Sequence, residues 1–363
     1  MSDVIKIKIQ LGNPASDNNQ FRLDIDTEFP RSGVTAIFGH SGSGKTTLLR
    51  CLAGLTRPEH ATISVNGTVW QNDKQFLKTH KRPLGYVFQE ASLFTHLTGE
   101  GNLQYAIKRS DMPFDNVFYD KIINMLGIES ALSRYPEQMS GGERQRFAIA
   151  RALLIRPKVL LMDEPLASLD QARKQEILPY LERLRDEIDI PIVYVSHSMD
   201  EIARLADEVI VLEQGKITAQ GELTEVFSRV DLPLHLQEQT GVIIKGKVIE
   251  QDKQWHLCKV AFNGGEIWVR DNGEQLNSTV RTRILARDVS LALQPQEDSS
   301  IVNKLYGTVM EMVPDDDQAM CLVRLKVGNE YIIARLTHRS AHKLGIKQDQ
   351  QLWVQIKSVA IVR

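Results

Sequence analysis

Short apolar runs alternate with helical patterns between about residues 30 and 230. Three of the runs, at 34–38, 159–162 and 192–195, are apolar on both faces. Strands that helices cover on both sides have this composition, and strands alternating with helices are typical of a parallel sheet with crossover connections. The pattern therefore predicts an α/β domain, which we place at residues 1–235.

Two helical features are expected within this domain. After Asp170, apolar residues recur at the spacing of one amphipathic helix, whose stripe we expect to pack in the core. They are Ile177, Leu178, Leu181, Leu184 and Ile188. Residues 90–157 are mostly helical in pattern and interrupt the series of strands, so we expect them to form a helical insertion. Residues 1–10 alternate apolar and polar positions, which predicts a first strand and not a signal peptide.

After about residue 235 the pattern changes to short alternating strands separated by turn signals at 263–265, 271–273 and 327–329. We expect a second, all-β domain at 236–363. Residues 245–248 resemble 306–309, and 286–289 resemble 356–359, which suggests two small OB-like barrels in tandem. Chance similarity between β-rich segments is the alternative.

Composition and charge narrow the classes of function. The 44 basic and 46 acidic residues nearly balance, which gives no overall attraction to nucleic acid or an anionic membrane, so any phosphate site must be local. The three cysteines are far apart and have no metal-ligand spacing, which fits a reducing compartment and argues against a disulfide framework. No window approaches the roughly 18 to 20 apolar residues that span a bilayer. Work at a membrane would require a partner.

The strongest motif directly follows the apolar run at 34–38 and fits G-x-x-x-x-G-K-[ST]. Its residues are Gly39, His40, Ser41, Gly42, Ser43, Gly44, Lys45 and Thr46, followed by Thr47 at the start of a helical pattern. In this context backbone N–H groups surround phosphates, Lys45 reaches the β- and γ-phosphates, and the Thr46 hydroxyl binds Mg²⁺. The motif predicts an α/β P-loop NTPase that uses ATP and Mg²⁺.

Two further motifs support a nucleotide site. Asp163 and Glu164 end a buried run, where the first carboxylate would hold Mg²⁺ and the second would polarise the attacking water. Ser140, Gly141 and Gly142 precede a helical run. Ser140 with Glu143 is also a capping box, but the two glycines are better explained by close backbone approach to an anion.

These motifs together resemble those of ABC transporter nucleotide-binding subunits. In that family the counterparts are the Walker A loop at 39–46, the Q-loop at Gln89, the signature at 140–145, Walker B with the catalytic Glu164, the D-loop at 168–170 and the switch His197. The resemblance implies an ABC ATPase core, with Gln89 joining Thr46 and Asp163 around Mg²⁺ and His197 sensing the γ-phosphate. It also implies a head-to-tail dimer in which the signature of one copy faces the phosphate loop of the other.

The same resemblance implies partners and a location. A membrane permease subunit would bind the chain, and an external or periplasmic binding protein would act through that permease. The chain would therefore lie at the cytoplasmic face of the cell membrane. The segment 91–97 carries exposed-looking apolar residues that suit a partner helix; the alternative is that they are ordinary core residues of the helical insertion. Two departures are Met139 and Glu143, where the family's signature usually has Leu and Gln. No aromatic residue occurs at 11–20, so Phe21 is the candidate for stacking on adenine.

The C-terminal segments 299–309 and 354–359 resemble the two ends of the molybdate-binding Mop domain, which would span about 298–363. With 165–170 and 99–103, they make nearly the whole chain similar to the ATP-binding subunits of molybdate importers. The resemblance implies uptake of molybdate and of tungstate. Import of sulfate, iron or sugar is the alternative within the same class.

An oxyanion site is expected near Ser300, Lys357 and Ser358, where molybdate would act as a regulator. Val302 stands where the Mop pattern commonly has Arg, and Asp288 occupies the place in the first repeat that Ser358 has in the second. A barrel that only mediates dimerisation is the alternative. A soluble nucleic-acid-acting ABC protein is disfavoured, because residues 240–363 hold 17 basic and 14 acidic residues without a basic, aromatic stripe. We therefore expect no nucleic-acid partner.

Overall fold

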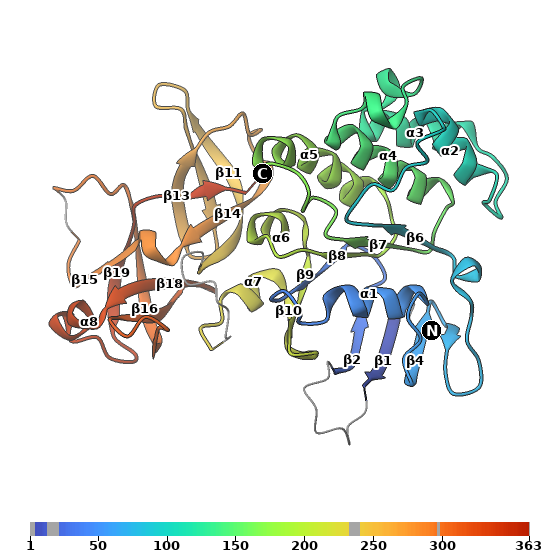
Figure 1. Cartoon of the computed structure of the whole chain (residues 1–363). Helices are drawn as coiled ribbons and strands as arrows, with labels where there is room; N and C mark the ends of the chain where they lie inside the picture. Colours follow the sequence, from blue (N-terminus) through green and yellow to red (C-terminus); the bar gives the residue numbers. More distant parts are fainter. Residues whose placement is uncertain (1–3, 13–21, 232–239, 296–297, 363) are drawn as a thin grey trace. The chain divides into compact units, whose positions relative to one another are not determined.

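The computed structural model describes residues 4–12, 22–231, 240–295 and 298–362 (Figure 1). Two compact units make up the chain, Met1–Gln220 and Gly221–Arg363. The division falls before residue 235 because the short helix α7 (Leu223–Phe227) packs against β11 (Gly241–Asp252), a strand of the second unit.

A six-stranded sheet forms the centre of the first unit, in the order β10-β9-β3-β8-β7-β6. Its strands are β3 (Val34–Phe38), β6 (Leu84–Val87), β7 (Val159–Asp163), β8 (Ile192–Val195), β9 (Glu208–Glu213) and β10 (Lys216–Glu222). The three apolar runs are the neighbouring strands β3, β8 and β7, which pair in parallel and are buried at every residue. The predicted α/β fold is confirmed.

A second, antiparallel sheet belongs to the same unit, in the order β2-β1-β4-β5. Its strands are β1 (Ile5–Leu11), β2 (Leu23–Phe29), β4 (His60–Val65) and β5 (Thr68–Gln71). In β1, buried Ile5, Ile7 and Ile9 alternate with exposed lysines, as a strand with one covered face requires. This strand is the one that the N-terminal alternation predicts.

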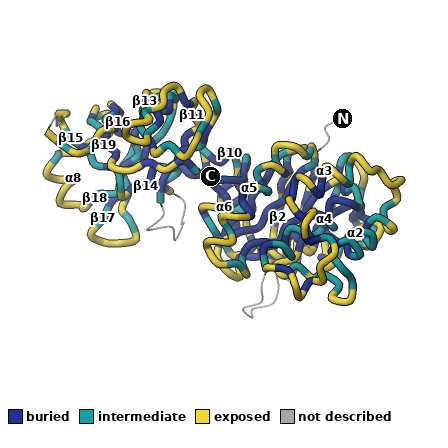
Figure 2. The backbone as a smooth tube through the Cα atoms, turned by 90° about the horizontal axis from the view of Figure 1, so that it is seen from above, coloured by how far each residue is buried: buried dark blue, intermediate teal, exposed yellow. Residues whose placement is uncertain are grey.

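Helices join and cover the parallel strands. They are α1 (Lys45–Ala53), α2 (Gly99–Ile107), α3 (Asn116–Leu126), α4 (Gly141–Leu154), α5 (Gln171–Glu187) and α6 (Met199–Leu205), with 3-10 turns at Thr79–Lys81, Glu129–Ala131 and Pro136–Gln138. Between β6 and β7 lie α2, α3 and α4. The predicted stripe of α5 is buried from Ile177 to Leu184. Figure 2 shows that the backbone is mostly buried (dark blue) in the interior of this unit and exposed (yellow) in many of its outer turns.

Two five-stranded sheets form the second unit, in the orders β13-β12-β11-β14-β20 and β15-β19-β16-β17-β18. The remaining elements are β12 (Leu257–Phe262), β13 (Gly265–Arg270), β14 (Thr279–Leu285), the 3-10 turn Ala286–Asp288, β15 (Val289–Ala292), β16 (Asn303–Pro314), β17 (Met320–Val327), β18 (Glu330–Thr337), α8 (His338–Leu344), β19 (Gln351–Ile356) and β20 (Ala360–Ile361). These curled sheets resemble the predicted OB-like barrels.

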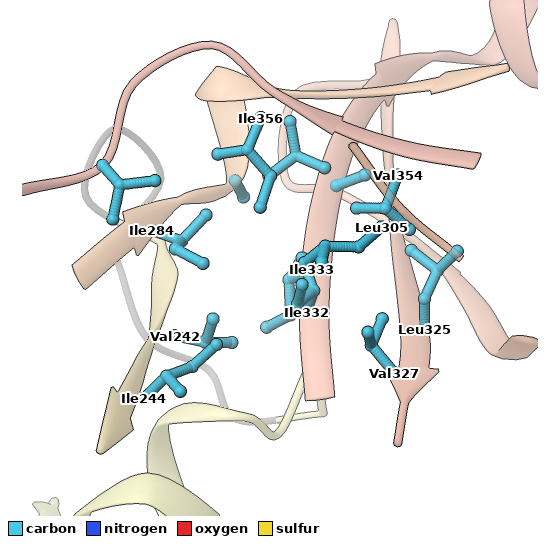
Figure 3. Packing of buried hydrophobic residues seen from close by; sticks show 14 of the residues in the cluster. Val242, Ile244, Ile284, Leu305, Leu325, Val327, Ile332, Ile333, Val354 and Ile356 are labelled. Carbon is cyan, nitrogen blue, oxygen red and sulfur yellow. The ribbon is translucent and has the colours of Figure 1, made fainter. Parts of the chain in front are cut away.

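One hydrophobic core serves both of these sheets. Figure 3 shows Val242, Ile244 and Ile284 of the first sheet beside Ile332 and Ile333 of the second. Strand β18, which carries both isoleucines, contacts β11 and β14. The two barrels therefore stabilise each other through shared burial of apolar surface.

The two sheets are copies of one arrangement. The long strands β11 and β16 each have 12 residues, and each is interrupted by a bulge directly after the matching residues Val248 and Val309. The final strand of each copy pairs with the other copy: β15 joins β19, and β20 joins β14. This reciprocal strand exchange supports the tandem repeat inferred from 245–248 and 306–309.

Candidate functional site

The glycine-rich loop connects β3 to α1 at the carboxyl edge of the parallel sheet. A Cβ on Gly39 would lie 2.2 Å from the carbonyl oxygen of Leu212, so only glycine fits there. Gly44, at φ 108°, is the N-cap of α1. The hydroxyl of Ser43 is buried and has no hydrogen-bond partner among the described residues. A buried orphan donor in a loop of this shape fits a phosphate oxygen.

Lys45 is a buried cation in this loop. Its ammonium group donates to the carbonyl oxygens of Gly39 and His40, each at 2.8 Å. Burial lowers the pKa of Lys45, and the carboxylates of Glu164 and Asp163 partly offset that effect. The loop thus holds a positive charge beside two carboxylates. An anionic ligand that carries a bound cation would complement both, because its negative charge would face Lys45 and its cation would face the carboxylates.

Asp163, at the end of β7, accepts two hydrogen bonds that fix its carboxylate. Thr46 Oγ1 donates to Oδ1 at 2.8 Å, and the Tyr86 hydroxyl on β6 donates to Oδ2 at 3.0 Å. Burial raises the pKa of Tyr86, and the charge of Asp163 adds to this effect. The parallel strands β6 and β7 and the first turn of α1 therefore meet at one carboxylate. The motif analysis did not identify Tyr86.

Glu164 and His197 come together at the ends of β7 and β8. Glu164 has the left-handed φ of 46°, and its backbone N–H donates to the carbonyl of Val195. His197 Nδ1 lies 3.2 Å from Glu164 Oε2. A strained backbone at a strand end is a common property of functional sites, and here it brings a carboxylate and an imidazole into contact.

The remaining predicted residues of the nucleotide site that the structure describes lie just after β6, at the start of α4 and in the first turn of α1. Gln89 is exposed, three residues beyond Tyr86. Ser140 caps α4, and the predicted capping box with Glu143 is present. A Cβ on Gly141 would lie 2.9 Å from Leu169 Cδ2, so packing also disfavours a larger residue there. Thr47 is half-buried in the first turn of α1, and Phe21 lies outside the described residues.

A cavity of about 380 Å³ lies beside the start of α4. The lining comes from the segment after Gln89, from α4 and the 3-10 turn before it, from the segment after Glu164 and from the first turn of α5. It includes Ala91, Leu93, Gly141, Arg144 and Ser168. The segment 91–97, expected to receive a partner, therefore borders a depression and not a flat surface.

Thr46 and Asp163 fit a Mg²⁺ ion. Both offer hard oxygen donors, and Mg²⁺ binds proteins through one or two carboxylates together with water and substrate phosphates. Within the described residues no group of three or more His, Cys, Asp or Glu side chains is arranged to hold a metal. A site that takes its other ligands from a nucleotide is consistent with this chemistry.

In the second unit, Ser300, Lys357 and Ser358 are exposed. Asn303 pairs with Ile356, so Ser300 and Lys357 both lie near this end of β16 and β19. The backbone N–H of Lys357 donates to the carbonyl oxygen of Asp288 at 2.9 Å. That N–H is therefore engaged, and an oxyanion here would depend on the side chains and on Ser358.

A phosphate loop, a fixed aspartate and a Glu–His pair, all at the carboxyl ends of adjacent parallel strands, define an ATPase of the ABC class. The ABC transporter family model matches residues 23–167, and the TOBE domain model matches 299–362. The chain belongs to the family of molybdenum import ATP-binding proteins. It is accordingly an ATP hydrolase of a transport complex.

Three relatives show how far this similarity extends. The molybdenum import ATP-binding protein ModC of Thiobacillus denitrificans is 55% identical over 94% of both chains. That of Methylococcus capsulatus is also 55% identical, over 94% of this chain and 96% of its own. That of Pseudomonas syringae pv. tomato is 46% identical over 100% of both. The similarity therefore includes both units.

A solved structure agrees with the fold of the first unit. CbiO1 of Clostridium perfringens, part of an ABC transporter complex, superposes with a TM-score of 0.54 at 28% identity. The match covers 63% of this chain and 92% of that one. None of the helices in the described ranges is long and apolar enough to cross a bilayer.

Proposed function

We propose that this chain couples ATP hydrolysis to the uptake of molybdate, and of the similar oxyanion tungstate, as the ATP-binding subunit of an importer. The observation that carries the proposal is 55% identity over 94% of both chains to a molybdenum import ATP-binding protein. An identity that extends through the second unit is informative about cargo, because the cassette alone is shared by importers of many substrates.

In this proposal the residues at 39–46, with Thr47, hold the phosphates of ATP. Thr46 and Asp163 hold Mg²⁺, with Gln89 joining them when nucleotide is bound. The ion would neutralise charge on the phosphate oxygens. Glu164 orients the attacking water and accepts its proton, and His197 donates a hydrogen bond to the γ-phosphate. The 3.2 Å contact between Glu164 and His197 supports this division of roles.

The active assembly in this proposal is a two-fold dimer. Ser140, Gly141 and Gly142 of one copy would face the phosphate loop of the other, so that two ATP molecules close the dimer and hydrolysis reopens it. The start of α4 suits this role, because its first backbone N–H groups and its helix dipole favour an anion.

The chain would act at the cytoplasmic face of the cell membrane through a permease. The depression beside the segment 91–97 supports this segment as the docking place for a permease helix. An external or periplasmic binding protein would deliver the oxyanion to that permease. Nucleic acid has no place in this assembly.

Transport in proteoliposomes tests the proposal. The full chain, its permease and its binding protein should accumulate labelled molybdate only when ATP is enclosed with the chain. Excess tungstate should compete with the label, whereas the same excess of sulfate should not. Accumulation of sulfate, iron or sugar in place of molybdate would assign the chain to another importer of the same class.

We also propose that Ser300, Lys357 and Ser358 bind molybdate as a regulatory ligand. Calorimetric titration of the full chain should show molybdate binding that weakens in the Lys357→Ala variant by about tenfold, the loss of one charge-assisted contact. Lys343→Ala, which removes an exposed lysine of α8, is the matched control. Absence of binding to molybdate, tungstate, sulfate and phosphate would leave this unit with a role in dimerisation.

A further inference from the structure

A buried carboxylate lies behind the catalytic edge of the first unit. Glu201, on α6, is 3% exposed. Its Oε1 accepts from Lys174 Nζ at 2.9 Å, and its Oε2 accepts from the hydroxyls of Tyr194 and Ser196, each at 2.8 Å. Burying a carboxylate away from water is unfavourable unless hydrogen-bond donors surround it. Because three donors bind this one buried carboxylate, the Glu201 side chain is held in a single position.

Each donor comes from an element next to the nucleotide site. Tyr194 lies in β8, and Ser196 directly precedes His197. Burial raises the pKa of Tyr194 well above its usual value, and the charge of Glu201 adds to this effect, so the phenol stays a donor. Lys174 lies in the first turn of α5, which begins after the N-cap Asp170. Glu201 thus joins the start of α5 to the His197 loop.

The same network anchors the chain on both sides of His197. Ser196 Oγ donates to Glu201 and accepts from the backbone N–H of Ser198 at 3.0 Å. Ser198 in turn caps α6 through the N–H of Glu201. The His197 side chain itself is 59% exposed, so packing constrains the ring little. Its direction toward Glu164 therefore depends on how its flanking residues are held.

We propose that Glu201 is a positioning residue for hydrolysis, which holds His197 toward Glu164 and ties this geometry to the start of α5. The inference rests on the proposed roles of Glu164 and His197. A carboxylate is required because it accepts from all three donors at once. The amide of glutamine would turn a donor toward Lys174 or toward the two hydroxyls.

The chain offers a matched control for the alternative that Glu201 has a purely structural role. Arg204 on α6 binds Glu182 on α5 through two hydrogen bonds, at 2.7 and 3.1 Å. These two hydrogen bonds link the same two helices, and neither of them involves a residue of the His197 loop. Loss of either link should loosen the α5–α6 contact, but only loss of Glu201 should disturb His197.

The first experiment compares Glu201→Gln with Glu182→Gln in the full chain. Glu201→Gln should lower kcat for ATP hydrolysis by about tenfold, as expected when a catalytic group loses its orientation. KM for ATP should change less than about twofold. The side-chain NMR signals of His197 should shift in Glu201→Gln and not in Glu182→Gln. Equal loss of kcat in both variants, or a parent kcat in Glu201→Gln, would overturn the inference.

The second experiment repeats Glu201→Gln in a His197→Ala background. If Glu201 acts through His197, the double variant should be no slower than His197→Ala alone. A further tenfold loss would show that Glu201 acts independently, and the inference would fail while the role of His197 stood. A parent rate in His197→Ala alone would instead refute the proposed role of His197, and the inference with it.

Discussion

Glu164→Gln is expected to bind ATP with the parent affinity and to hydrolyse it at least about a hundredfold more slowly. General-base catalysis contributes about 10²- to 10⁴-fold to rates, and the amide of glutamine cannot accept the proton. We propose Glu164 for this task, since its left-handed backbone directly after β7 accompanies a distance of 3.2 Å between Oε2 and His197 Nδ1. The ATPase rate at saturating ATP and a nucleotide-binding titration measure the two parts of this result.

The same variant should also accumulate as an ATP-bound dimer. Hydrolysis would reopen the proposed dimer, so a chain that binds ATP without hydrolysing it should stay closed. Size-exclusion chromatography with and without ATP measures this. Glu176→Gln, which removes an exposed carboxylate from α5, should behave like the parent. Turnover of Glu164→Gln at the parent rate would remove Glu164 from the catalytic role.

Lys45→Met is expected to weaken ATP binding by about 10- to 100-fold. Hydrogen bonds to charged groups contribute about 1.5 to 3 kcal/mol, and a Lys45 cation that is already desolvated gives up little hydration when it binds phosphate. Methionine keeps the length and apolar stem of the side chain but removes the charge. The dissociation constant for ATP, measured by calorimetry on the full chain, is the test.

Lys158→Met supplies the comparison, because it removes an exposed lysine from the same unit. Its affinity for ATP should remain within about twofold of the parent. If Lys45→Met bound ATP as the parent does, the phosphate-binding role of the loop would need another cation. If both variants lost affinity equally, a general electrostatic effect would explain the result in place of a contact.

The parallel sheet could be predicted because its signal is local in the sequence. Strands 34–38, 159–162 and 192–195 are apolar on both faces, and the structure places them side by side. The meeting of Thr46 with Asp163 also follows from topology, since carboxyl ends of parallel strands share one edge. The need for glycine at position 39 could also be predicted, because the phosphate-loop motif places a glycine where the backbone must approach another group closely.

Other contacts have no such signature. Tyr86 and Asp163, or Lys174 and Glu201, are hydrogen-bond partners that no periodicity relates. Arg82 is another example: it is buried, and its guanidinium donates to the carbonyls of Cys51 and Leu52 at the end of α1. From the sequence alone, Arg82 would be expected at the surface, because arginine is mostly exposed in proteins. The engagement of the Lys357 N–H by Asp288 likewise could not be foreseen.

The exchange of β15 and β20 has a consequence for biosynthesis. β20 pairs with the outer edge of β14, and β20 is available only after the whole second repeat has been synthesised. Until then the first sheet has an open edge, and unpaired strand edges promote association with other chains. Non-local pairing of this kind also slows folding. The nascent first repeat is therefore the stage at which this protein should depend most on chaperones during translation.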